Sequence, residues 1–115
     1  MTRKLPVDLL QGTLDLLILR TLLPGPAHGH AIAKHIQRTS EDLLQVENGS
    51  LYPALHRVEA QGWIAASWQL SDKGKRARYY RLTPLGRRQL VSKQSKWQAF
   101  ARAIGLILNR AEEEQ

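Results

Sequence analysis

Residues 48–84 read NGSLYPALHRVEAQGWIAASWQLSDKGKRARYYRLTP, and the order of patterns in this stretch decides the fold. In its first part, apolar residues recur at positions i, i+3, i+4 and i+7, which predicts a helix with one face in the core. We expect Ser50 to be the N-cap of this helix, Pro53 to lie in its first turn, and Gly62 to end it.

The second part of the stretch predicts a β-hairpin. Hydropathy alternates along residues 64–70, the turn residues SDKGK follow at 71–75, and residues 78–82 are rich in aromatic side chains that favour strands. Thr83 then caps a last helix, whose first position is Pro84.

Two shorter helices are expected before this stretch. The first would run from Asp8, with Gln11 completing a capping box, to about Leu23. Its leucines form two stripes, so two sides should be buried, and in so small a chain the second side would meet a partner subunit. The second helix would cover residues 29–39, and residues 43–46 would form a short strand.

The last helix is expected to reach about Asn109. Leu90, Trp97 and Ile104 recur every seven residues, which predicts a seam for another helix. The seam could instead pack only on its own domain, but the helix is too long for so small a core to cover, and this favours a contact between subunits. The predicted dimer interface comprises Leu9, Leu16, Leu90, Trp97, Phe100, Ala101, Ile104 and Leu108.

Three helices followed by a two-stranded hairpin indicate a winged helix-turn-helix, which is a mainly α fold with a small β-hairpin. The third helix would enter a major groove of DNA, and the hairpin would be the wing. We expect a winged-helix DNA-binding domain over residues 8–83, a dimerisation helix over 84–110 and an acidic tail over 111–115.

Charge is distributed unevenly along the 115 residues. Residues 1–72 hold 6 basic and 7 acidic side chains, whereas residues 73–111 hold 11 basic side chains and no acidic one. This asymmetry favours a polyanionic partner such as nucleic acid, although a solvated basic face would look the same. The longest unbroken apolar run near the N-terminus, Leu16 to Leu19, is too short for a signal peptide or a membrane span.

The sequence contains few of the residue patterns expected of an enzyme or a metal-binding protein. The chain has no cysteine, which fits a reducing cytoplasm and excludes a disulfide scaffold or a thiolate nucleophile. His28 and His30 lack a third ligand at useful spacing, and no nucleophile elbow or glycine-rich phosphate loop is present. We therefore expect no catalysis, no metal and no cofactor.

Basic and polar side chains gather where the fold would meet DNA. Arg57 could bind guanine with two hydrogen bonds, and Tyr52 and His56 could donate to bases or phosphates, although plain surface residues would look alike. The predicted DNA-binding residues are Ser50, Tyr52, Pro53, His56 and Arg57 of the third helix and Lys73, Lys75, Arg76 and Arg78 of the hairpin.

The chain also resembles the PadR family of bacterial transcriptional regulators along most of its length. The resemblance is carried by GTLDLLILRTL at 12–22, PAHGHAIAKHI at 26–36, QVENGSLYPALHRVEAQGWI at 45–64 and RARYYRLTPLGRRQL at 76–90. It implies a winged-helix dimer held by its C-terminal helix that represses transcription at palindrome-like operators. It also implies DNA-facing positions for Ser50, Tyr52, His56 and Arg57, and a wing position for the basic residues 73–78. The family usually has Tyr where this chain has His30.

Some members of that family bind flat aromatic compounds at the dimer interface through an aromatic residue of the last helix. Trp97 matches that position by resemblance, and the alternative is an ordinary seam residue. Two other functions remain open from the sequence: a non-specific nucleic-acid-binding protein, which would share the basic field, and a protein-interaction or sensing module whose role on DNA is secondary.

Overall fold

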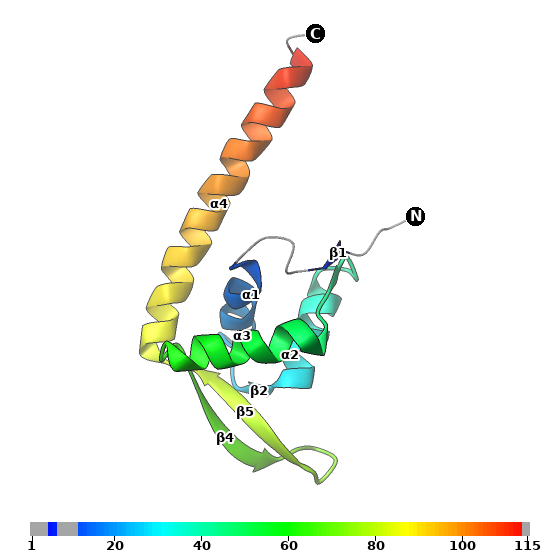
Figure 1. Ribbon diagram of the computed structural model, residues 1–115, viewed down its shortest axis with the longest axis vertical. Helices are drawn as coiled ribbons and strands as arrows, with labels where there is room; N and C mark the ends of the chain where they lie inside the picture. Colours follow the sequence, from blue (N-terminus) through cyan, green and yellow to red (C-terminus); the bar gives the residue numbers. More distant parts are fainter. Residues whose placement is uncertain (1–4, 7–11, 114–115) are drawn as a thin grey trace.

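The computed structural model describes residues 5–6 and 12–113, with four helices and five strands (Figure 1). The helices are α1 (Thr13–Thr21), α2 (Gly29–Thr39), α3 (Asn48–Ala60) and α4 (Pro84–Glu113). The strands are β1 (Leu5–Pro6), β2 (Ala27–His28), β3 (Leu44–Gln45), β4 (Ile64–Leu70) and β5 (Arg76–Leu82). In Figure 1, α1 to α3 cluster together and the β4–β5 hairpin projects from one end of them, whereas α4 begins beside the base of the hairpin and extends far in the opposite direction.

The core lies between the first three helices and the base of the hairpin. The predicted α3 stripe is confirmed, because Leu51, Ala54, Leu55 and Val58 are all fully buried. Apolar residues of the other helices, among them Ile18, Leu19 and Ile32, complete the cluster. Full burial of an aliphatic side chain of this size stabilises the fold by about 1.5–3 kcal/mol. The core therefore fixes which side of α3 can face outward.

The first helix differs from the prediction at both ends. It begins at Thr13 after Gly12, which has φ 82°, and it ends at Thr21, where residue 23 had been expected. A left-handed backbone such as that of Gly12 is readily adopted only by glycine, so this residue sets the angle at which the chain enters α1. The predicted cap at Asp8 and Gln11 lies outside the described residues, as does Leu9.

The start of α3 corrects another prediction. Glu47 is the N-cap, in extended conformation, and its carbonyl accepts from the backbone N–H of Ser50 and of Leu51. Ser50 therefore lies within the helix, and Pro53 is an interior residue, beyond the first turn that we expected. The end of the helix follows the prediction closely: Gly62 has φ 78° and comes just after the C-cap, as in a Schellman motif.

The hairpin is confirmed, and a third strand joins it. β4 and β5 pair antiparallel from Ile64–Leu82 to Leu70–Arg76, and β5 begins two residues earlier than expected. The short strand β2 pairs antiparallel with Tyr79 and Tyr80 on the other edge of β5. This third strand joins the start of α2 directly to the hairpin, which positions the wing relative to the helices.

The long helix α4 is rooted in the core at its first turn. Thr83 caps it as predicted, since its Oγ1 accepts from the backbone N–H of Gly86 at 3.0 Å and donates to the carbonyl of Gly62 at 2.7 Å. Leu90 of α4 is buried in the core of its own chain. The helix continues to Glu113, four residues beyond the predicted end, and thereby includes the start of the acidic tail.

At Gly86, the backbone of α4 packs tightly against the end of α3 and the start of β4. A Cβ at this residue would lie 2.0 Å from the carbonyl oxygen of Trp63, a backbone atom that cannot rotate away. We expect Gly86→Ala to lower the free energy of unfolding by about 1–3 kcal/mol, because α4 would be pushed off the turn between α3 and β4.

The matched control is Gly105→Ala in the same helix, where a Cβ would meet nothing within 4 Å. Alanine favours helix over glycine, so this variant should gain about 0.5–1 kcal/mol. Chemical denaturation at one fixed protein concentration measures both changes, and equal shifts of the two variants would contradict this account.

Candidate nucleic-acid interface

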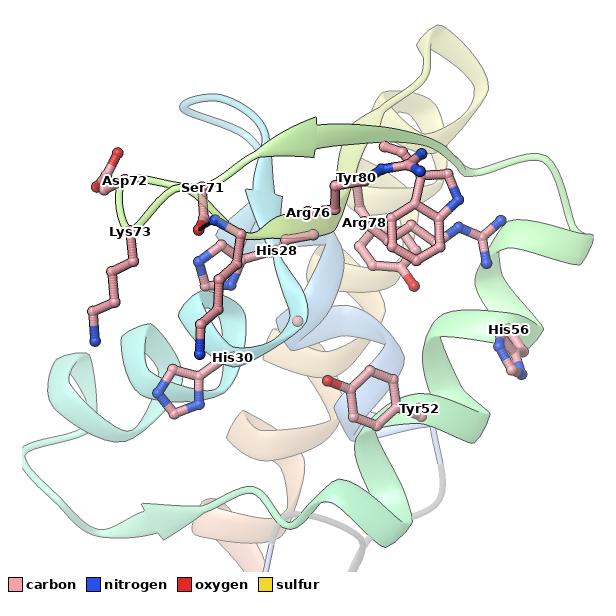
Figure 2. A pocket seen from close by; sticks show the side chains of 14 residues that line it. His28, His30, Tyr52, His56, Ser71, Asp72, Lys73, Arg76, Arg78 and Tyr80 are labelled. Carbon is pink, nitrogen blue, oxygen red and sulfur yellow. Dashed lines mark hydrogen bonds between the residues drawn. The ribbon is translucent and has the colours of Figure 1, made fainter.

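An open groove separates the helices from the hairpin. Its volume is about 660 Å³, and it is bordered by the start of α2, the outer side of α3 and one face of the β4–β5 hairpin. In Figure 2, Tyr52 and His56 on α3 and His30 on α2 lie across the groove from the labelled hairpin residues, whereas His28 lies close to β5. The lining residues are His28, Gly29, His30, Tyr52, His56, Trp68, Ser71, Asp72, Lys73, Lys75, Arg76, Ala77, Arg78 and Tyr80.

His28 lies at the edge of the groove that is formed by the start of α2. It is the N-cap of α2, and its Nδ1 accepts from the backbone N–H of Ala31 at 3.1 Å. The ring also stacks on His30, with centroids 6.4 Å apart, and meets the edge of Tyr79 at 5.3 Å. An accepting Nδ1 leaves the ring's other nitrogen as the donor in the neutral form. His28 thus holds a helix terminus and a strand of the hairpin in one fixed relation.

Gly29 permits the close packing of α2 against α3. A Cβ at this residue would come within 3.1–3.3 Å of the Oη, Cε1 and Cζ atoms of Tyr52. That distance is tighter than almost all such contacts, so any side chain here would displace the tyrosine. Tyr52 is nevertheless 42% exposed, so it packs on α2 with part of the ring and presents the rest to the groove.

Arg57 does not line the groove, and it has an intramolecular partner. Its Nη2 lies 2.5 Å from Oδ1 of Asp15 on α1, and its Nε donates to Oδ2 at 3.2 Å. The hydrogen bond to Asp15 raises the pKa of Arg57, against the opposing effect of burial, so the side chain stays protonated. Sequence reasoning missed this pair, for which the only signal was a single acid within the leucine-rich segment 14–19.

The face of the hairpin that borders the groove combines aromatic and basic side chains. Trp68 is 60% exposed, and the guanidinium of Arg76 lies 5.4 Å from its ring centroid, within the range of a cation–π contact. Arg78 donates from Nη2 to Oε2 of Glu59 on α3 at 2.9 Å. Arg78 therefore braces the hairpin against α3, whereas Lys73 and Lys75 lie at the turn.

Tyr80 closes the inner end of the groove. It belongs to strand β5 and is almost completely buried, and this burial raises the pKa of its hydroxyl, with Arg78 acting in the opposite direction. The floor of the groove is therefore neutral, and its positive charge comes from the rim.

The structure brings together most of the predicted DNA-binding residues. Tyr52, His56, Lys73, Lys75, Arg76 and Arg78 share the groove, whereas Ser50, Pro53 and Arg57 are not among the residues that line it. Sequence reasoning missed the start of α2, which reaches the groove through the pairing of β2 with β5. It also missed Trp68, which lies on β4 opposite Arg78. One acid, Asp72, also lies in the lining.

Comparison with known proteins decides the family. Residues 18–92 match the transcriptional regulator PadR-like family. The chain belongs to this family of transcriptional regulators. A transcriptional regulator of Mycobacterium tuberculosis is 33% identical over 87 residues, which cover 76% of this chain and 78% of that protein.

Two solved structures extend the likeness to the fold. A transcriptional regulator from Clostridium thermocellum superposes with a TM-score of 0.77 at 31% identity, covering 85% of this chain and 95% of the other. A PadR family transcriptional regulator from Eggerthella lenta gives a TM-score of 0.72 at 33% identity, covering 85% and 83%. These likenesses confirm the predicted winged-helix fold and a DNA-binding regulator in place of an enzyme.

The PadR-like chain leaves the predicted seam largely uncovered. Trp97, Phe100, Ile104 and Leu108 of α4 are exposed and Ala101 is half-buried, whereas Leu90 packs inside its own domain. Leu16 of α1 borders a shallow hollow of about 280 Å³ between α1 and α4, together with Trp97, Phe100, Lys93 and Lys96.

The part of the chain that the structure describes holds neither a cluster of metal ligands nor a membrane-spanning helix. Within residues 5–6 and 12–113, no three His, Asp or Glu side chains gather closely enough to hold a metal ion. None of the helices formed by the described residues is both long and apolar enough to cross a bilayer.

Proposed function

We propose that this PadR-like regulator represses transcription as a homodimer that binds a two-fold symmetric DNA operator. The observation that carries the proposal is the groove, because one surface joins the exposed side of α3 to a basic hairpin. In winged-helix proteins the corresponding helix enters a major groove and the wing follows the neighbouring backbone. Repression is the function that the family resemblance implies for such a surface.

The two parts of this surface suit different tasks. Lys73, Lys75 and Arg76 lie on the hairpin that borders the groove, where cations without base contacts would supply affinity for phosphates. Residues 1–72 are close to neutral, so sequence preference on α3 must come from a few side chains such as Tyr52, His56 and Arg57. The alternative is a non-specific nucleic-acid-binding protein that uses the basic hairpin alone.

Dimerisation through α4 would cover the exposed seam. Trp97, Phe100 and Ile104 stand on a helix that extends well beyond the core, and each exposes at least 40% of its surface. Aromatic and aliphatic side chains of this size at seven-residue spacing are the usual content of a helix–helix interface. Two copies joined in this way would present two reading helices, as a palindromic operator requires.

A small aromatic effector would bind in the hollow between α1 and α4. The indole of Trp97 and the ring of Phe100 offer flat apolar surfaces there, and Lys93 and Lys96 offer positive charge. Since α4 would also form the dimer, an occupant of this hollow could change the separation of the reading helices and release the operator.

Selection from random DNA at physiological salt tests sequence preference directly. We expect the chain to enrich a two-fold symmetric motif, with half-sites about one helical turn, roughly 34 Å, apart. A sequence-specific regulator should prefer this motif about 10³- to 10⁷-fold over random DNA. Recovery of random sequence would favour the non-specific binder.

The seam is tested by Ile104→Glu, which places a charge among the apolar residues of α4. We expect light scattering to show a particle of twice the chain mass for the wild type and a monomer for this variant, because an interface excludes an unpaired charge. Val91→Glu is the control, since Val91 is 68% exposed and lies on the opposite side of α4. A wild-type monomer at micromolar concentration would refute the dimer.

Trp97 provides a fluorescent probe for an effector. A panel of flat aromatic compounds should contain at least one that quenches its emission and weakens DNA binding. Trp97→Ala should lose this response, whereas Trp68→Phe should retain it, because Trp68 lies in the hairpin groove and away from the α1–α4 hollow. If no compound changes the spectrum, Trp97 is a seam residue only.

A further inference from the structure

Asp15 is unusual in its position. Among the described residues, it alone combines charge with burial, and its side chain is 11% exposed. Both carboxylate oxygens receive hydrogen bonds from one side chain, that of Arg57, which comes from α3 and is 54% exposed. A buried carboxylate on α1 therefore holds a partly exposed cation of the proposed reading helix.

The contact uses only part of the guanidinium. An arginine carries five N–H donors in a rigid planar fork. Asp15 engages one donor on Nε and one on Nη2, which leaves both donors of Nη1 and the second donor of Nη2. Two adjacent nitrogens of such a fork are what bidentate binding to O6 and N7 of guanine requires.

We propose that Asp15 is a positioning residue for DNA recognition, and that it orients the remaining Nη1–Nη2 edge of Arg57 toward a guanine in the major groove. This inference rests on the proposed function of α3 as the reading helix. Asp15 touches no DNA itself, since it is buried beneath α3.

Two physical consequences distinguish a positioning role of Asp15 from an ion pair that only holds α1 and α3 together. A free arginine samples many rotamers and loses that freedom on binding, whereas the paired side chain has already lost it on folding. A free arginine can also turn to any nearby phosphate, which adds affinity without preference. Release of Arg57 should therefore lower discrimination between sequences more than it lowers affinity for random DNA.

The experiment compares full-length Asp15→Asn, Arg57→Lys and the double variant with the wild type. Each is titrated with the sequence that the wild type selects from random DNA, with single-base-pair changes of it, and with random DNA. We expect each single variant to lose roughly 5- to 100-fold of its preference at the same guanine in each half-site. The double variant should lose no more than either single variant, because both changes break one unit.

Two controls account for charge and for phosphate binding. Asp42→Asn removes one negative charge by the same chemical change, at an exposed residue outside the groove lining. Its φ of 64° is one that asparagine tolerates, and it should leave the preference unchanged. Lys75→Ala should weaken binding to all sequences alike and lower the salt dependence by about one phosphate contact.

The outcomes separate the two levels of the proposal. If the wild type selects no motif, the proposed function fails and this inference fails with it. If the wild type selects a motif but Asp15→Asn keeps the full preference, the inference alone is overturned, whatever Arg57→Lys does, and the pair is a tie between helices. Should Asp15→Asn not fold, Asp15→Glu decides, because it keeps the negative charge but moves the carboxylate and with it the guanidinium that it orients.

Discussion

The burial of one side of α3 is the constraint on which the remaining structure depends. Leu51, Leu55 and Val58 are completely enclosed by neighbouring elements. Truncating a core side chain of this kind to alanine usually costs about 2–5 kcal/mol, which is a large part of the stability of a small domain. Because this side cannot turn outward, Tyr52 and His56 must lie on the other side, where the groove begins. The position of the proposed DNA-facing surface is thus a consequence of packing.

Three polar contacts fix the elements around α3 once its core side is buried. The Asp15–Arg57 pair joins it to α1, the Glu59–Arg78 pair joins it to the hairpin, and Thr83 joins its end to α4. Ion pairs that stay partly exposed to solvent usually contribute little net stability, about 1 kcal/mol or less. The buried carboxylate of Asp15 also loses its hydration, which offsets part of the attraction to Arg57. The value of the three contacts here is geometric, because each of them selects one relative orientation of elements that apolar packing alone would allow to slide.

The features that could be predicted from the sequence are those set by neighbouring residues. The apolar stripe of α3, the Gly62 stop, the hairpin turn and the Thr83 cap each depend on a few consecutive positions, and the structure contains all four. The features that were missed depend on distant partners. Asp15 and Arg57 are 42 residues apart, and β2 is too short to leave any periodicity. The start of α3 was misplaced because the carbonyl of Glu47, a backbone atom, receives the first bonds.

The long helix α4 links the winged-helix domain to the exposed apolar seam. Its first turn is clamped by Thr83 and by the close contact at Gly86, and Leu90 is embedded in the same core as α3. Beyond that point the helix is exposed along its apolar seam. Because the start of α4 is fixed to the winged-helix domain, a small rotation of the far end of this helix would move the whole domain. In the proposed dimer, the distance between the two reading helices would therefore be set at the seam. The two reading helices can occupy half-sites one turn apart only if the distance between them matches that spacing. Recognition would therefore depend on α4 as much as on the side chains that touch DNA.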